Sequence, residues 1–263
     1  MQLQQLDRAR NPYAAAAHEE VVRIFDVQGR HLVSFDETSV NNRTALKRRG
    51  WSKKGLRAES KGVVTTPGVH RTVLAALTLS GGFNTAHALI VEGPCGHEVV
   101  TRWVKEAVRR GLVGRFPEDD NSAFLMDNWA GHNLDEIRQE VESVGGLLLC
   151  NAPKFWEYQP CEPGFNVFKA ALRRGGQEAY LADPYAAIGA ALDCVTPAIA
   201  AGLIRGCKIY PMPAVGAAAS AAGMLGAVEQ EELAVEQAVG GYFAAGGAGG
   251  AGGDEEGEGG AAE

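Results

Sequence analysis

Apolar residues recur with two different periods along the first 210 residues, and this alternation predicts a domain built from both helices and strands. Intervals of four residues between Tyr13 and Phe25 predict a helix over residues 13–25. Short apolar runs then predict three strands, over residues 31–35, 71–80 and 86–92. Gly81 and Gly82 separate the last two runs as a tight turn would, so we expect these three strands to be antiparallel.

The following 120 residues alternate between helical and strand patterns. Residues 97–110 place Val and Trp on one face and Arg and Lys on the other, which is typical of an amphipathic helix. Further strands are expected over 122–126 and 146–150, and further helices over 132–144, 164–174, 183–194 and 196–210. The predicted fold class is therefore α/β, with a mixed sheet of three antiparallel strands followed by parallel strands and helices on both faces.

Charge divides the chain into a body and a tail. The net charge is −7, yet residues 211–263 hold nine acids and no Lys or Arg, whereas residues 1–210 hold 23 acids and 25 bases. The body is therefore slightly basic, which leaves an anionic partner open. Residues 211–263 are rich in Ala, Gly and acids, and we expect them to form a disordered low-complexity tail.

Composition and motifs argue against several classes of protein. The five cysteines form no CxxC pair, which favours a reducing compartment, and no GxxxxGK motif supports a nucleotide-binding fold. The first residues lack the apolar run of a signal peptide. The uncharged stretch at residues 211–228 is mostly Ala and Gly, which insert poorly into a bilayer. We therefore expect a protein that is neither secreted nor bound to a membrane.

Three acids lie at the edges of predicted apolar elements. Asp36 directly follows the first predicted strand, Asp127 directly follows the fourth, and Glu162 lies in the loop that opens the helix predicted from residue 164. Ligands bind at strand ends in α/β sheets, and oxygen ligands favour Mg²⁺ or Mn²⁺. Two such ions can act together on a phosphodiester. Spacing alone also allows each acid to be a helix cap or a solvated loop residue.

Three sequence blocks around these acids form an ordered pattern. The first is FDET at residues 35–38 with Arg43 and RGWSKKG at 49–55, the second is LMDNWAGH at 125–132, and the third is PKFWEYQPCEPGFNVFK at 153–169. Thirty-four residues separate Asp127 from Glu162. In motif, order and spacing these blocks resemble the catalytic motifs of mariner-type transposases, and the resemblance extends over about residues 1–210.

The resemblance implies a fold, a reaction and a set of site residues. It implies an RNase H-like DDE catalytic domain over residues 31–180, preceded by a helical extension (1–30) and followed by helices packed on the domain (181–210). Asp36, Asp127 and Glu162 would be the catalytic residues and would hold two Mg²⁺ or Mn²⁺ ions for DNA cleavage and strand transfer. The residues expected to support these ligands are Glu37, Asn128 and His132, although capping or turn roles stay open for them.

A basic segment follows the first acid. Residues 43–61 hold eight bases against one acid, Glu59, and a cluster of this density next to a predicted site indicates contact with DNA phosphates. A solvated loop is the alternative interpretation. Lys169 matches the Lys of the third motif and is assigned to the same group. The predicted DNA-binding residues are Arg43, Lys47, Arg48, Arg49, Lys53, Lys54, Arg57, Lys61 and Lys169.

Two departures from the family pattern leave the activity open. Gln159 and Cys161 stand where the third motif usually has Asn and Ile, so the loop that positions Glu162 is expected to differ. Only 35 residues precede Asp36, so we expect the paired helix-turn-helix modules of these transposases to be missing. The chain is thus predicted to be a fragmentary or domesticated transposase catalytic domain, or alternatively a catalytically inactive descendant that binds DNA or protein.

The expected partners and compartment follow from the same resemblance. DNA is the expected partner, with a homodimer or a separate end-binding protein supplying recognition of the DNA ends. The location would be nuclear in a eukaryotic host and cytoplasmic otherwise.

Overall fold

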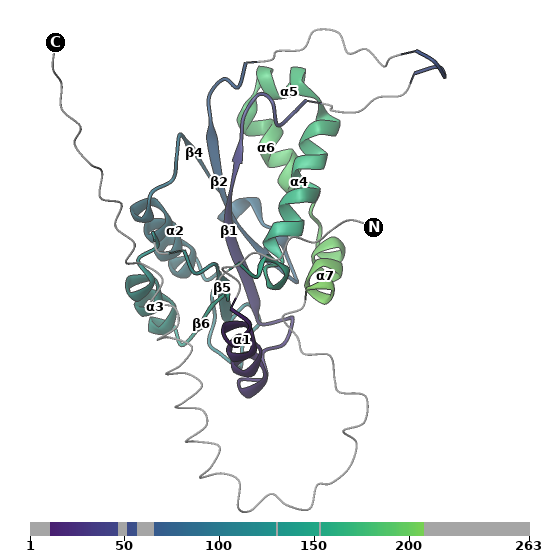
Figure 1. The fold of residues 1–263 in the computed structure, drawn as a ribbon. Helices are drawn as coiled ribbons and strands as arrows, with labels where there is room; N and C mark the ends of the chain where they lie inside the picture. Colours follow the sequence, from purple (N-terminus) through teal and green to yellow (C-terminus); the bar gives the residue numbers. More distant parts are fainter. Residues whose placement is uncertain (1–10, 47–51, 57–65, 130, 153, 208–263) are drawn as a thin grey trace, which may run out of the picture.

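The computed structural model describes residues 11–46, 52–56, 66–129, 131–152 and 154–207, and these form a mixed sheet covered by helices (Figure 1). The sheet has six strands in the order β3-β2-β1-β5-β6, with β4 also paired to β2. Five of the predicted DNA-binding residues, Lys47, Arg48, Arg49, Arg57 and Lys61, lie outside the described residues, as does the predicted tail at 211–263.

Strand β1 (Leu32–Val40) is the centre of the sheet. It pairs antiparallel with β2 (Arg71–Thr78) on one side and parallel with β5 (Ala123–Met126) on the other. Strand β6 (Leu147–Cys150) extends the parallel half. The order of strands and their directions confirm the predicted α/β class, with antiparallel strands followed by parallel ones.

Strand β1 is longer than the sequence pattern predicts. The apolar run ends at Phe35, but backbone pairing with β2 continues from Val33–Thr78 to Val40–Arg71. Asp36 therefore lies inside β1, and the prediction that it follows the strand is wrong. The polar residues after position 35 remain in the strand because the interstrand hydrogen bonds to β2 hold the backbone extended.

The third strand, predicted over residues 86–92, begins only at Leu89, and a short additional strand forms at the predicted turn. Strand β3 (Gly82–Phe83) and strand β4 (Leu89–Glu92) both pair with β2, and the 3₁₀ helix η1 (Thr85–His87) lies between them. Gly82 belongs to β3 rather than to the turn alone. Its φ of +64° and the Val195 carbonyl oxygen, 1.8 Å from where a Cβ would stand, both require glycine there.

Helices α2 (His97–Arg109) and α3 (Leu134–Ser143) cover one face of the sheet. The apolar stripe of α2 is buried against the sheet, and the ring of Trp103 stacks on that of Phe35 with centroids 4.5 Å apart. Helix α3 begins at Leu134 rather than 132, because the Asn133 side chain caps it.

The other face is covered by four α-helices in contact with the sheet, α1 (Pro12–Ile24), α4 (Cys161–Gly175), α6 (Pro184–Asp193) and α7 (Pro197–Gly206). The short α5 (Gln177–Ala182) joins α4 to α6. Helix α4 begins three residues earlier than predicted, which places Glu162 in its first turn and corrects the loop assignment. No single described helix has the length and apolar character to cross a membrane; α6 and α7 meet that test only together, bent by 67°.

Candidate active site

The register of the parallel strands brings Asp36 next to Asp127. The β1–β5 ladder pairs Leu32 with Ala123 and ends at Ser34 with Leu125. Continued by two residues, the same register sets Asp36 opposite Asp127, at the point where β5 ends and β1 runs on. The motif resemblance implied that the two acids are neighbours, and the strand register places their backbones side by side.

Asp36 points to the face of the sheet that carries α4. Its neighbour Phe35 packs on Trp103 of α2, and alternate side chains of a strand point to opposite faces. Ser34, on the same face as Asp36, accepts a hydrogen bond at Oγ from the backbone N–H of Cys161, 3.3 Å away, in the first turn of α4. Glu162 follows Cys161 in α4, and its charge, like that of Asp127, acts on Asp36.

Burial and like charges raise the pKa of Asp36 well above its usual value. Burial is the largest cause, the negative charge of Asp127 is next, and Glu162 and Glu37 act in the same direction. A hydrogen bond of 2.8 Å from the Glu37 backbone N–H to Oδ1 of Asp36 opposes the rise. The carboxylates therefore repel one another, and a cation bound between them would lower this repulsion.

His132 connects two of the predicted site residues. Its Nε2 atom lies 3.0 Å from Oδ1 of Asp127 and 3.8 Å from Oε1 of Glu37, and its side chain is fully buried. Burial alone lowers the pKa of His132, but the hydrogen bond to Asp127 and the two negative charges outweigh it and raise the pKa above its usual value. Burial likewise raises the pKa of Glu37. Asn128 is half-buried directly after Asp127.

Lys169 lies two helical turns after Glu162 on α4. Burial lowers its pKa, while the charges of Glu162 and Asp36 raise it and that of Arg173 lowers it. This half-buried ammonium group therefore lies near the carboxylates. Arg43, Lys53 and Lys54 are exposed in the segment after β1.

The donor set fits a divalent cation chemically. Asp36, Asp127 and Glu162 offer only oxygen atoms, the ligands that Mg²⁺ and Mn²⁺ prefer, and Oε2 of Glu37 is buried without a hydrogen-bond partner in the described structure. Within the described residues, however, no three His, Cys, Asp or Glu side chains converge tightly enough to hold one metal ion.

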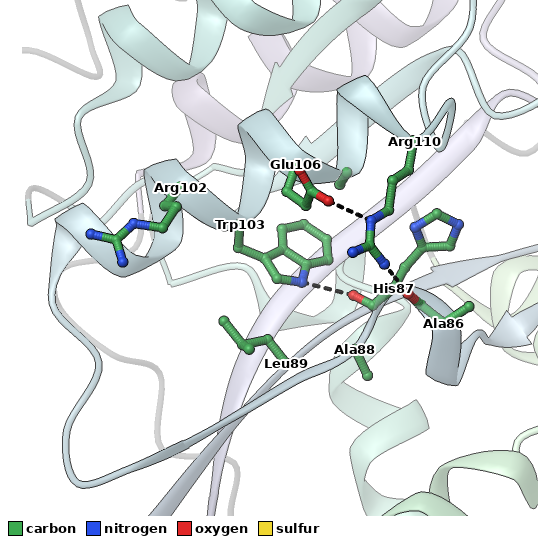
Figure 2. Close-up of a pocket in the computed structure, with 9 residues that line it drawn as sticks. Ala86, His87, Ala88, Leu89, Arg102, Trp103, Glu106 and Arg110 are labelled. Carbon is green, nitrogen blue, oxygen red and sulfur yellow. Dashed lines mark hydrogen bonds and ion pairs between the residues drawn. The ribbon is translucent and has the colours of Figure 1, made fainter.

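A cavity of about 310 Å³ lies on the opposite face of the sheet, between α2 and residues 86–89. Figure 2 shows Trp103 of α2 and Arg110, the residue after that helix, directed toward this segment, where the Trp103 indole N–H donates to the His87 carbonyl oxygen at 2.7 Å. Arg110 donates to the Ala86 carbonyl oxygen at 3.3 Å and to Glu106 at 2.6 Å. These residues tie α2 to the edge of the sheet, and none of them belongs to the carboxylate site.

Sequence reasoning missed the residues that attach α4 to β1. Gln159 and Cys161 are both buried and bond to the backbone of β1 next to Asp36. The signal for them was the departure from the third motif at these two positions, which indicated a change without showing what the new side chains contact.

Comparisons with known proteins identify the fold. No protein-family model and no curated protein matches the sequence. The chain is similar to the crystal structure of the mariner Mos1 paired-end complex with Mg, with a TM-score of 0.53, 14% identity, and coverage of 78% of this chain and 62% of that chain. The Mos1 mariner paired-end complex with Mn gives a TM-score of 0.49, 15% identity, and coverage of 78% and 66%. The chain thus spans less than two thirds of either Mos1 chain.

The sheet order and the helices on both faces define an RNase H-like fold. Within that class, the chain has the fold of a mariner-type transposase catalytic domain, as the sequence motifs predicted.

Proposed function

We propose that this chain is a DDE-type transposase catalytic domain that cleaves and joins phosphodiester bonds of DNA. The observation that carries the proposal is the gathering of Asp36, Asp127 and Glu162 at the end of the β1–β5 ladder, where their negative charges repel. Proteins that share one fold can have different functions, so the proposal depends on the residues of this site and not on the fold.

Asp36, Asp127 and Glu162 would hold two divalent ions, Mg²⁺ or Mn²⁺. Such ions activate an attacking oxygen and stabilise the leaving oxygen of a phosphodiester. The protein's own contribution would be to hold the three carboxylates close together, and the bound ions would favour the ionised form of Asp36, whose pKa the fold alone raises. His132 supports this arrangement because its hydrogen bond to Asp127 restricts the orientation of that carboxylate.

DNA is the proposed partner. Lys169 places a cation beside the carboxylates, where a scissile phosphate would lie, and Arg43, Lys53 and Lys54 add exposed positive charge after β1. These side chains would bind the backbone independently of sequence. Recognition of particular DNA ends would then fall to a second copy or to a separate protein, in whichever compartment holds the chromosome.

A catalytically inactive DNA-binding descendant is the second candidate. The observation that favours it is the hydrogen bond from His132 to Asp127, which already uses one carboxylate oxygen of the proposed metal site. The side chains of the described residues do not converge as metal ligands in this structure, which agrees with either candidate.

Titration with Mn²⁺ by calorimetry, together with nicking of supercoiled plasmid, separates the two candidates. The proposal expects the wild type to bind Mn²⁺ and nick, and Asp127→Asn to lose both. Asp135→Asn is the control, because Asp135 is an exposed acid in the first turn of α3. Nicking by Asp127→Asn at the wild-type rate would refute the metal-site assignment, and a wild type that binds DNA without binding Mn²⁺ would establish the inactive descendant.

A further inference from the structure

The start of α4 is attached to the middle of β1 by three buried hydrogen bonds. The Gln159 side-chain Nε2 donates to the Phe35 carbonyl oxygen at 2.6 Å. The Cys161 backbone N–H donates to Oγ of Ser34 at 3.3 Å, and the Cys161 thiol donates to the Ser34 carbonyl oxygen at 2.8 Å. Gln159 is 2% exposed and Cys161 is fully buried, so water does not compete for these bonds.

These bonds join the residues immediately beside two proposed metal ligands. Ser34 and Phe35 directly precede Asp36, and Cys161 directly precedes Glu162. The backbone of β1 is held by β2 through the whole strand, so it is a rigid reference for anything bonded to it. The hydrogen bonds of Cys161 and Gln159 to Ser34 and Phe35 therefore fix the backbone next to Glu162 relative to the backbone next to Asp36.

The Phe35 carbonyl is available because the β1–β5 ladder has ended. The carbonyl oxygen of His31 accepts from the Ala123 backbone N–H at 2.8 Å, and alternate carbonyl groups of a strand point to the same side. The Phe35 carbonyl therefore points toward β5. The β1–β5 pairing ends at Ser34 and Leu125, so the Phe35 carbonyl lies just beyond it, near the last residue of β5. The amide of Gln159 supplies a donor at this position.

Gln159 makes this bond while its other amide atom has none. Its Oε1 is buried and has no hydrogen-bond partner in the described part of the chain. A buried acceptor without a partner is unfavourable, so the bond made by the Nε2 donor is the favourable contact of this amide in the described structure.

We propose that Gln159 and Cys161 are positioning residues that set the distance between Glu162 and Asp36. The inference rests on the proposed function, since it concerns the same carboxylates. It explains how the altered third motif keeps its glutamate in place: a longer amide and a small thiol hold the first turn of α4 on β1. A displacement of about 1 Å at a catalytic group can lower a rate about 100-fold, so these two contacts control the activity of the site.

The test compares two glutamines that bond to backbone carbonyl groups. Gln159→Met keeps the length of the side chain and removes the donor beside the site. Gln177→Met is the matched control, because Gln177 Nε2 donates to the Asn42 carbonyl oxygen at 2.9 Å, at the far end of α4. Both full-length variants are compared with the wild type by Mn²⁺ affinity, by kcat and KM for plasmid nicking, and by amide hydrogen exchange in the first turn of α4.

The expected result is specific to Gln159. Gln159→Met should lower kcat about 100-fold with little change in KM for DNA, weaken Mn²⁺ binding and speed hydrogen exchange in the first turn of α4. Gln177→Met should change none of the three. Cys161→Ser, which keeps a donor toward Ser34, should stay close to the wild type, whereas Cys161→Ala should resemble Gln159→Met.

The outcomes distinguish this inference from the proposed function. A wild type that neither binds Mn²⁺ nor nicks would refute the proposed function, and hydrogen exchange would still test whether Gln159 holds the start of α4. A wild type that nicks, with Gln159→Met and Cys161→Ala both at the wild-type kcat, would overturn the positioning role. Equal losses in Gln159→Met and Gln177→Met would overturn it as well, because the effect would then be one of general stability.

Discussion

The Nε2 atom of His132 lies 3.0 Å from Oδ1 of Asp127, so one predicted site residue is the hydrogen-bond partner of another. The two are five residues apart, and the loop after β5 folds back to place the imidazole between Asp127 and Glu37. The sequence left a capping role open for His132, but it is Asn133 whose side chain caps α3. The contact instead links the carboxylate site to the α2 face of the sheet, toward which Glu37 points.

Removal of the His132 imidazole should weaken the site without removing a metal ligand. Groups that support a metal ligand typically contribute 10–100-fold to affinity or activity, so His132→Ala is expected to lower Mn²⁺ affinity and nicking within that range. His97→Ala is the control, because His97 is exposed at the start of α2. Calorimetry and plasmid nicking measure the effect, and equal behaviour of the two variants would assign His132 a packing role only.

Neutralisation of Asp36 should stabilise the fold while it abolishes metal binding. Burial and the charge of Asp127 raise the pKa of Asp36 above its unfolded value. Its contribution to stability is therefore favourable below the unfolded pKa and is lost as the pH rises through the folded one. Asp36→Asn should thus unfold at a higher urea concentration than the wild type at pH 7 without metal. A lower midpoint would show that the ionised carboxylate has a stabilising partner in the fold.

Acid should destabilise the protein through His18. Burial lowers the pKa of His18 to about 4, although the hydrogen bond between its Nδ1 and the Cys150 carbonyl oxygen at 3.2 Å opposes this. The unfolded chain binds a proton near pH 6.5 and the folded chain only near pH 4, so stability is lost as the pH falls through this window, by about 3 kcal/mol in all.

His18→Asn keeps a donor toward Cys150 and removes the titrating group. Its urea midpoint should depend less on pH between 6.5 and 4 than that of the wild type, whereas the exposed His97→Asn should retain the wild-type dependence. Parallel pH profiles for the wild type and His18→Asn would contradict the assignment.

The contact of α4 with the sheet depends on Phe168. This side chain is fully buried in the core that joins α4 and α6 to β1 and β2. Truncation of a buried Phe leaves a cavity, so Phe168→Ala should lower the free energy of unfolding by about 3–5 kcal/mol. Asn166→Ala, exposed on the same helix, should change it by less than about 0.5 kcal/mol. Urea denaturation followed by circular dichroism measures both, and similar midpoints would place α4 off the sheet.

Positive charge after β1 should control the salt dependence of DNA binding. Lys53 and Lys54 are exposed, and each phosphate contact contributes about 0.9 to the slope of log K against log salt. The double change to Ala should therefore reduce that slope by about two and weaken binding to all sequences alike. Arg102→Ala with Lys105→Ala removes equal charge from α2 and is the control. Unchanged slopes in the Lys53 and Lys54 variant would make this segment a solvated loop.

Much of the fold follows from local patterns. Apolar residues spaced four positions apart predicted helices, and short apolar runs predicted strands. Both patterns involve neighbouring residues, so the sequence alone shows the order of the elements. The alternation of strands and helices predicted the mixed sheet. The three motif blocks selected Asp36, Asp127 and Glu162 as candidates, and in the structure the charges of Asp127 and Glu162 act on Asp36.

Other features depend on contacts between segments that are far apart in the chain. Pairing with β2 extends β1 beyond Asp36, and it also makes a short strand of Gly82 and Phe83, where a turn was predicted. Bonds from Gln159 and Cys161 to β1 accompany the early start of α4. No local pattern reports these hydrogen bonds, because their partners are set by strand register and by the burial of groups that water would otherwise satisfy.

What the sequence reveals and what only the structure reveals therefore differ for a physical reason. The sequence by itself determined which elements form and which acids are available, since periodicity and motif spacing are properties of nearby residues. Only the tertiary structure decided that Asp36 stands opposite Asp127 and that α4 begins against β1, since these positions arise from the β1–β5 register and from buried hydrogen bonds between β1 and α4.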